Sequence, residues 1–428
     1  MEYSFAESGM LLLKVNMVQA VALAVITYFL GVWIKRRVPV LARFSIPSPV
    51  IGGMLCAAIL SGLEDQGIMR VTFDSTLQTV LMLGFFTTIG LTASLKLVTN
   101  GGKILVTFLM AVTVLAFLQN VVGMGAAWLM GIDTHYGILA GSVSMMGGLG
   151  TAAAFGPYFE QTYGISGGTA MAITAATFGM VAALLVGGPL GEWLIRRYKV
   201  QIPNEHGNLA EPLHIPTEVE TGVQDDHSGN KPAFTRELMK AVSVVTLTLA
   251  AGMIVSKWLG AYITLPAYIG SMIVAAIVRN VGDYTGAYKV TGKGLDAVAD
   301  ICLILFVTMA INSLKLHELI NLAGPLVVIL ALQTALALLF GWLVIFLLIG
   351  RNYTAVMLAA GGVGFSMGAT ANALANMQAL AEKYGTCPQA WLIVGVVGAF
   401  LIDLINALLI RIGDLAVAVG TYERLQLL

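Results

Sequence analysis

The chain has 428 residues, of which 58% are hydrophobic and only 11% are charged, and its formal net charge at pH 7 is zero. A soluble globular domain carries about 25% charged residues, so the composition excludes an ordinary soluble protein and predicts a membrane protein. The neutral balance implies no nucleic-acid partner, and three widely spaced cysteines predict neither a disulfide framework nor a metal site.

Apolar runs long enough to cross a hydrocarbon core of about 30 Å recur along the chain. The expected fold class is therefore an all-α polytopic membrane protein embedded in a lipid bilayer. A polar, Pro-containing stretch over residues 199–236 predicts a solvated linker. In chain order, we expect membrane-spanning helices at residues 10–34, 46–63, 77–95, 104–130, 166–195, 239–257, 262–278, 295–314, 322–349 and 389–412.

The Lys and Arg residues indicate an orientation for these spans. They cluster at the ends and loops on one side, with Lys35, Arg36 and Arg196 among them. Cytoplasmic loops of membrane proteins carry an excess of Lys and Arg. We therefore expect this side to be cytoplasmic and both termini to lie on the outer side.

Two halves of the sequence match each other. Ile51-Gly52-Gly53-Met54 resembles Ile269-Gly270-Ser271-Met272 at an offset of 218 residues, and Ser94-Leu95-Lys96-Leu97 resembles Ser313-Leu314-Lys315-Leu316 at an offset of 219. Each half holds five spans, so the second half would insert upside down relative to the first. We predict a repeat at 1–198, a cytoplasmic linker at 199–236 and an inverted repeat at 237–428. Inverted repeats are typical of secondary transporters that work by alternating access.

Two Gly-rich segments, 136–156 and 353–376, are apolar enough to lie at membrane depth but too interrupted for continuous helices. Non-helical backbone at that depth is tolerated where it is buried in protein or lines a watery cavity. We interpret both segments as re-entrant loops whose backbone amides bind a small carboxylate. The alternative is close helix packing through small residues. The candidate substrate contacts are Ser144, Gly147, Gly148, Gly150, Thr151, Gly364, Gly368, Ala369, Thr370, Asn372 and Asn376.

A few polar residues lie inside the spans and are candidates for binding a cation. A carboxylate such as Asp403 is costly inside a membrane and should face the interior of the helix bundle. Asp403, Asn406, Gln119, Asn120 and Thr88 could supply oxygen ligands to sodium. Each could instead make a structural hydrogen bond, and helix threonines often bond to their own backbone.

An ordered set of motifs completes the sequence evidence: Ile46-Pro-Ser-Pro-Val-Ile-Gly-Gly53, Phe85-Phe86-Thr87-Thr88-Ile89-Gly90-Leu91, Gln119-Asn120, Gly147-Gly148-Leu149-Gly150-Thr151, Gly364 to Thr370, Ala375-Asn376-Met377-Gln378 and Gly398-Ala-Phe-Leu-Ile-Asp403-Leu-Ile-Asn406-Ala407. With these motifs, nearly the whole chain resembles the bacterial glutamate:sodium symporter family. The resemblance implies a glutamate carrier of the bacterial inner membrane, with sodium as coupling ion and no other cofactor. It also implies paired pore loops, a homodimer and elevator-like transport. Leu149 and Asn372 depart from the family pattern, which has His and Pro there, so the exact substrate stays open.

Other functional classes fit the sequence less well. A cation/proton antiporter would share inverted repeats but usually needs two buried carboxylates, and the sequence offers one good candidate in Asp403. An ion channel fits less well because channels more often build one pore from several subunits. The five His lie in no metal spacing, and no Walker loop or Ser/His/Asp set is present. We therefore expect neither an enzyme nor an ATP-driven pump.

Overall fold

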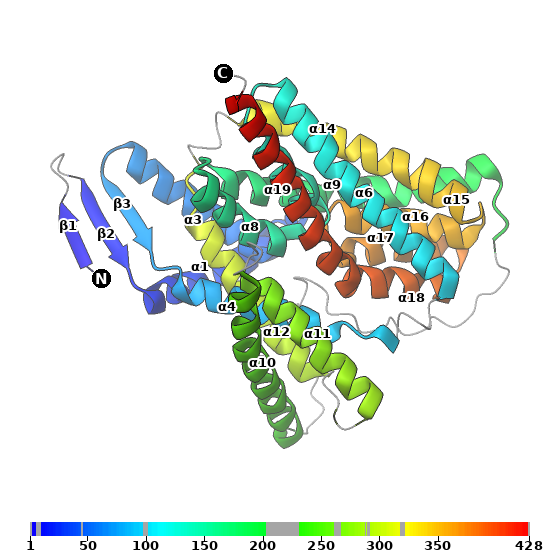
Figure 1. Ribbon diagram of the computed structural model, residues 1–428, viewed down its shortest axis with the longest axis horizontal. Helices are drawn as coiled ribbons and strands as arrows, with labels where there is room; N and C mark the ends of the chain where they lie inside the picture. Colours follow the sequence, from blue (N-terminus) through cyan, green and yellow to red (C-terminus); the bar gives the residue numbers. More distant parts are fainter. Residues whose placement is uncertain are drawn as a thin grey trace. The chain divides into compact units, whose positions relative to one another are not determined.

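A computed structural model of the chain describes residues 2–5, 10–43, 46–96, 102–202, 231–260, 267–286, 288, 292–316 and 322–426 (Figure 1). Most of these residues are helical, which confirms the predicted helical membrane class. Within this described part, six helices are long and apolar enough to cross a membrane: Met17–Arg37, Gly102–Leu129, Gly168–Tyr198, Phe234–Trp258, Lys293–Asn312 and Ala323–Ile349.

The chain forms two compact units, and each combines segments from before and after the predicted linker. Unit 1 comprises residues 1–92, 156–173 and 218–323, and unit 2 comprises residues 93–155, 174–217 and 324–428. The division falls within helices α8 (Gly148–Tyr163) and α9 (Gly168–Tyr198).

Unit 1 contains a small sheet and two groups of helices. Its first segment holds β1 (Glu2–Phe5), β2 (Leu11–Val15), α1 (Met17–Arg37), α2 (Pro39–Arg43), α3 (Ser48–Asp65), β3 (Met69–Phe73) and α4 (Thr76–Thr92). Its last segment holds α10 (Lys231–Gly260), α11 (Ala267–Thr285) and α12 (Lys293–Asn312).

The sheet was not predicted. β2 is its central strand, antiparallel to β1 with Phe5 opposite Leu11 and parallel to β3 with Val15 opposite Phe73. The expected first span, residues 10–34, is therefore wrong at its start, because Leu11–Val15 is a strand. The helix begins at Met17, where Asn16 and Gln19 form a reciprocal capping box that satisfies free backbone N–H groups.

Helices α1 and α3 touch backbone to backbone in unit 1. A Cβ atom at Gly52 would lie 1.7 Å from the Thr27 carbonyl oxygen, and one at Gly31 would lie 2.1 Å from the Ser48 carbonyl oxygen. Only glycine permits so close an approach. In the second group, α10 and α11 touch in a similar way, since a Cβ atom at Gly270 would lie 2.6 Å from the Ser256 backbone nitrogen.

Unit 2 contains interrupted helices. Its first part holds α6 (Gly102–Leu129), α7 (Thr134–Ile138), the π-helical turn η1 (Leu139–Val143) and the start of α8, followed by most of α9. The remainder holds α14 (Ala323–Phe340), η2 (Gly341–Phe346), α15 (Leu347–Ile349), α16 (Tyr353–Ser366), α17 (Thr370–Tyr384), α18 (Pro388–Val396), η3 (Val397–Leu401) and α19 (Ile402–Gln426).

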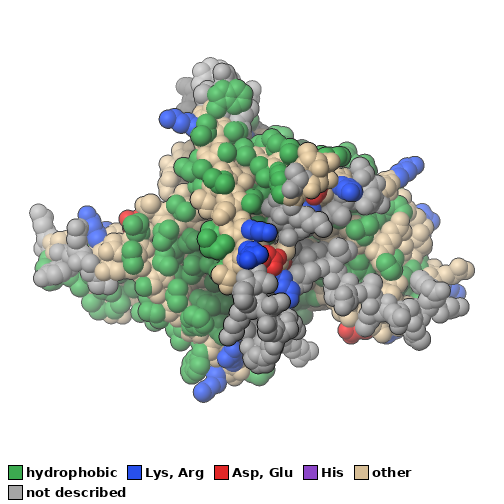
Figure 2. All heavy atoms as spheres, turned by 90° about the horizontal axis from the view of Figure 1, so that it is seen from below, with side chains coloured by type: hydrophobic (Ala, Val, Ile, Leu, Met, Phe, Trp, Pro, Cys, Tyr) green, Lys and Arg blue, Asp and Glu red, His purple; other side chains and the backbone are tan. Residues whose placement is uncertain are grey.

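The surface agrees with a lipid environment. Figure 2 shows one face on which hydrophobic side chains predominate and charged side chains are sparse. Large apolar side chains are exposed on several helices, among them Phe29 at 62%, Leu247 at 72% and Leu348 at 71%. In water such a surface would drive aggregation, whereas lipid tails would cover it.

Candidate functional site

Each predicted Gly-rich segment forms a helix that breaks in the middle. The first runs through α7 and η1, turns at Met146 and Gly147, and restarts as α8 at Gly148, whose φ is +62°. The second runs through α16, turns over residues 367–369, and restarts as α17 at Thr370. The N-cap residue of α17 is Ala369, which has no side-chain cap. The first N–H groups of α17 therefore remain available to an anion.

The second broken segment is a closed helical hairpin, and Figure 1 shows its arms α16 and α17 side by side. At its base, the Tyr353 hydroxyl donates to the Gly385 carbonyl oxygen at 2.5 Å. Near its tip, a Cβ atom at Gly364 would lie 2.5 Å from the Cα of Ala373, so the two arms are in backbone contact. The two ends of the hairpin therefore lie together, at the end opposite its tip.

Adjacent amides on α6 contact both broken segments. The side-chain oxygen of Asn120 accepts from the Ser142 backbone N–H at 3.0 Å, and Gln119 Nε2 donates to the Ser366 carbonyl oxygen at 2.7 Å. Both amides are buried, at 2% and 0% exposure. Helix α6 thus connects the first break to the tip of α16.

Two further amides join this network from other helices. Asn406 on α19 donates through Nδ2 to the Ser142 carbonyl oxygen at 3.0 Å, and that oxygen also accepts from the backbone N–H groups of Met146 and Gly147. Gln333 on α14 donates through Nε2 to the Gln119 carbonyl oxygen at 2.7 Å. The interior of unit 2 is therefore a hydrogen-bonded polar cluster inside an apolar shell.

Several oxygen atoms of this cluster are buried and have no hydrogen-bond partner among the residues that the structure describes: Gln119 Oε1, Gln333 Oε1, Asn406 Oδ1 and Ser142 Oγ. A buried polar atom without a partner is costly, so each one needs an explanation, such as a bound water or ion. Neutral amide and hydroxyl oxygens are ligands that hard cations prefer. The cluster therefore suits a cation such as sodium.

Asp403 lies in the first turn of α19, one turn before Asn406 and two residues after the end of the π-helical turn η3. Its side chain is half-buried. Thr88 lies in α4 of unit 1, whereas all the other predicted site residues lie in unit 2. The Thr88 hydroxyl donates to the carbonyl oxygen of Phe85 in its own helix at 2.6 Å, which is the structural bond considered above.

The polar residues after the second break bind to neighbouring helices. Asn372 Nδ2 donates to the Met180 carbonyl oxygen at 2.8 Å, and Asn376 Nδ2 donates to that of Ala183 at 3.0 Å. The Thr370 hydroxyl donates to the Gly398 carbonyl oxygen at 2.7 Å. These bonds fix the start of α17 against α9 and the turn before α19.

The small residues around the breaks pack closely against their surroundings. A Cβ atom at Gly147 would lie 2.5 Å from the Thr151 side chain, and one at Gly368 would lie 2.4 Å from Nδ2 of Asn372. The Ser144 hydroxyl donates to the Leu139 carbonyl oxygen at 2.5 Å, within the π-helical turn η1 and the residue after it. Gly148 and Gly150 belong to the buried first turn of α8.

Sequence reasoning missed Gln333, Ser142 and Ser366. Gln333 is an amide inside the predicted span 322–349, and the same signal that singled out Gln119 could have identified it. The two serines act through their backbone groups, for which side-chain identity gives no signal.

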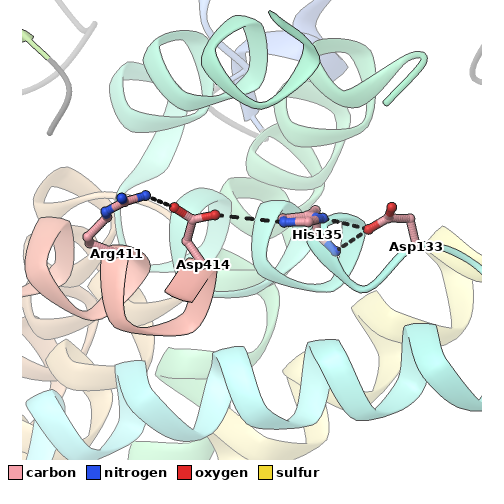
Figure 3. Close-up of polar contacts among 4 residues, drawn as sticks. All are labelled: Asp133, His135, Arg411 and Asp414. Carbon is pink, nitrogen blue, oxygen red and sulfur yellow. Dashed lines mark hydrogen bonds and ion pairs between the residues drawn. The ribbon is translucent and has the colours of Figure 1, made fainter. Parts of the chain in front are cut away.

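Sequence reasoning also missed a chain of ionisable side chains in unit 2 (Figure 3). His135 Nδ1 lies 2.7 Å from Asp133, its Nε2 lies 3.7 Å from Asp414, and Arg411 pairs with Asp414. The hydrogen bond from His135 holds the pKa of Asp133 below its usual value. Asp414 is 1% exposed, so α19 carries a buried carboxylate in addition to the half-buried Asp403. The predicted span ended at residue 412 and therefore did not include Asp414.

Unit 1 has a polar cavity of its own, with a volume of about 210 Å³. Its lining combines hydroxyl, amide and charged groups, and it includes none of the predicted site residues. The polar lining residues are Ser75, Gln78, Glu160, Gln161, Thr169, Ser313 and Lys315.

Comparison with known proteins gives one consistent result. The sequence model of a family described as sodium/glutamate symporter matches residues 13–386. The sodium/glutamate symporter of Escherichia coli (strain K12) is 37% identical over 390 residues, which is 91% of this chain and 95% of that protein. The sodium/glutamate symporter of Haemophilus influenzae (strain ATCC 51907 / DSM 11121 / KW20 / Rd) is 36% identical over 396 residues, covering 92% and 96%.

Proposed function

This chain belongs to the sodium/glutamate symporter family, and we propose that it carries glutamate, or a related small carboxylate, into the cell together with sodium. The resemblance inferred from the motifs is confirmed. A symporter is a transporter and not an enzyme, in agreement with the sequence. The many apolar helices agree with a multi-pass bacterial membrane protein.

The observation that carries the proposal is the amide cluster of unit 2. Its unpartnered oxygens, Gln119 Oε1, Gln333 Oε1 and Asn406 Oδ1, would coordinate sodium without a full negative charge. Asp403, one turn before Asn406, would contribute a carboxylate near the ion. Asn120 would act indirectly, by holding the first break through Ser142.

The two breaks are the proposed substrate site. A glutamate carboxylate would be bound by the N–H groups that begin α17 after Ala369 and by the backbone around Gly147 and Gly148. Asn372 and Asn376 already donate to α9 carbonyl groups. We therefore infer that they place α17 and act on substrate through its position.

Three observations support the inverted repeat, with boundaries at 1–198, 199–236 and 237–428. Each compact unit takes segments from both halves. Gly52 and Gly270, matched in the sequence, each form a backbone-close helix contact. The breaks begin at Met146 and Met367, an offset of 221 residues that is close to the sequence offset. Such a repeat would support alternating access, of the elevator type that the resemblance implies.

We further propose a homodimer in the bacterial inner membrane with both termini outside. Single cysteines at Lys14 and Arg196, in a variant lacking the three native cysteines, would test sidedness with a membrane-impermeant thiol reagent on whole cells. Labelling at position 14 and protection at position 196 support this orientation, and the reverse pattern would overturn it.

Cation/proton antiport is the second candidate, because α19 carries a buried carboxylate, Asp414, beside the half-buried Asp403 that the sequence offered. Transport assays in proteoliposomes of purified protein distinguish symport from antiport. Symport predicts glutamate uptake that requires an inward sodium gradient and stops when potassium replaces sodium. Glutamate uptake that does not change with the sodium gradient, together with sodium-dependent proton release, would refute symport and favour antiport.

A further inference from the structure

Two basic residues of unit 2 have an unusual backbone conformation. In the described part of the chain, Lys199 and Arg351 are the only residues other than glycine with positive φ, at +49° and +54°. This left-handed region is disfavoured for residues with a Cβ atom, and glycine usually occupies it at the end of a helix.

Both residues lie where a helix ends. After α9, the Val200 backbone N–H donates to the Ile195 carbonyl oxygen at 3.1 Å, with Lys199 in the intervening left-handed position. After α15, the Arg351 backbone N–H donates to the Phe346 carbonyl oxygen at 3.2 Å. Glycine would form either helix end with less strain, so the backbone alone does not explain why a cation is present.

An aromatic cluster holds the two helix ends together. The rings of Trp193 and Trp342 pack edge to face at 5.1 Å, and Trp342 Nε1 donates to the Tyr198 hydroxyl at 2.9 Å. The ring of Tyr198 packs on Phe346 at 4.9 Å. Lys199 directly follows Tyr198, and the Arg351 backbone N–H donates to the carbonyl oxygen of Phe346. Both cations therefore lie next to this aromatic cluster.

The cluster has an excess of positive charge. Arg196 and Lys383 both pair with Glu192. By contrast, Arg197, Lys199 and Arg351 are exposed and make no ion pair in the described part of the chain. Among the residues that the structure describes, these three cations therefore have no carboxylate partner.

The cluster is suited to the boundary of a membrane. Helix α9 has 31 residues and would be about 46 Å long, which exceeds a hydrocarbon core of about 30 Å. Trp and Tyr concentrate at the level of lipid headgroups. Beside them, Leu343 and Leu348 are 46% and 71% exposed and would face acyl chains.

We propose that the ends of α9 and α15 form a binding site for an anionic phospholipid. Lys199, Arg351 and Arg197 would contact the headgroup phosphate, and Trp193, Trp342 and Tyr198 would pack against the glycerol region. The lipid phosphate would then supply a counter-charge that no carboxylate in the described part of the chain provides. This site is separate from the amide cluster and does not depend on which solute is transported.

The test uses full-length protein in a neutral detergent and the double variant Lys199→Gly with Arg351→Gly. Phosphatidylglycerol is titrated in while the thermal unfolding midpoint is measured. A basic residue near an anionic lipid strengthens binding about fivefold, so we expect binding to the double variant to weaken about 25-fold. Glycine adopts positive φ without strain. The thermal unfolding midpoint of the double variant without lipid should therefore be no lower than that of the wild type.

The control variant Lys14→Gln with Lys257→Gln removes two exposed cations from unit 1 and should respond to phosphatidylglycerol as the wild type does. Phosphatidylcholine and inorganic phosphate should not raise the midpoint. An equal response of the wild type and the glycine variant would overturn the proposal. An equal shift with inorganic phosphate or with phosphatidylcholine would also overturn it, because the site would then not select an anionic lipid.

Discussion

Replacing Asn406 by Leu gives the sharpest test of the amide cluster. Leucine has a similar shape but removes both the Nδ2 donor and the unpartnered Oδ1. The Ser142 carbonyl oxygen keeps its bonds from Met146 and Gly147, so the loss of one hydrogen bond should cost about 1 kcal/mol of stability. If Oδ1 is a sodium ligand, the loss of an ion contact of about 1.5–3 kcal/mol should raise the half-saturating sodium concentration about 10- to 150-fold.

Asn376→Leu is the matched control. Asn376 is equally buried, at 3% exposure against 1% for Asn406, and donates to a carbonyl oxygen at the same 3.0 Å. Its substitution should cost a similar stability but leave the half-saturating sodium concentration unchanged. Both variants would be measured in proteoliposomes at saturating glutamate, with sodium varied. Equal sodium dependence in the two variants would refute the assignment of Asn406 to the ion.

Three other predictions concern stability, measured by thermal or denaturant unfolding of the purified protein. Tyr353→Phe removes the bond to Gly385 and should cost about 1 kcal/mol, and no loss would mean that this bond does not close the hairpin. Gly52→Ala should destabilise the protein by about 3 kcal/mol or more, because the added Cβ would overlap the α1 backbone. The control Gly62→Ala should be neutral or stabilising, because its Cβ would meet no atom within 4 Å. Similar effects of the two substitutions would contradict the close packing of α1 on α3. Asp133 has a lowered pKa, so it stabilises the fold above its unfolded pKa of about 3.9, and this contribution is lost as pH falls through its lower folded value. Asp133→Asn should flatten that acid limb of the stability curve, and an unchanged limb would refute the role of Asp133.

Several helices could be predicted from the sequence to within a few residues, because apolar length is a local signal, but α10 begins at Lys231, before the predicted 239, and α19 continues to Gln426, beyond the predicted 412. The predicted spans 77–95 and 104–130 correspond to α4 and α6, and the break in each Gly-rich segment was expected. The strand Leu11–Val15 was not, because five apolar-rich residues before an apolar helix extend the same pattern. Its parallel partner Met69–Phe73 lies beyond the three helices α1, α2 and α3, where no local pattern points to it. Only the capping pair Asn16 and Gln19 marked the true start of the helix.

The site could be predicted in residue type but not in role. Gln119, Asn120 and Asn406 stood out because amides are rare within spans, and all three lie in the cluster of unit 2. Asn372 was equally conspicuous, yet its amide donates to α9, because side-chain direction depends on packing that the sequence does not reveal. Asp414 was missed because the predicted span ended two residues before it.

The position of Gln119 next to Asn120 gives a physical reason for coupling two solutes. Neighbouring residues on a helix point in different directions, so α6 can contact both breaks through adjacent side chains. Gln119 binds the tip of α16 and Asn120 binds the first break. An ion coordinated by Gln119 Oε1 would therefore order the backbone proposed to bind the carboxylate. By thermodynamic reciprocity, a carboxylate that orders the same backbone must strengthen ion binding by the same factor. Symport requires such mutual stabilisation, and the two adjacent amides place both parts of it on a single helix of unit 2.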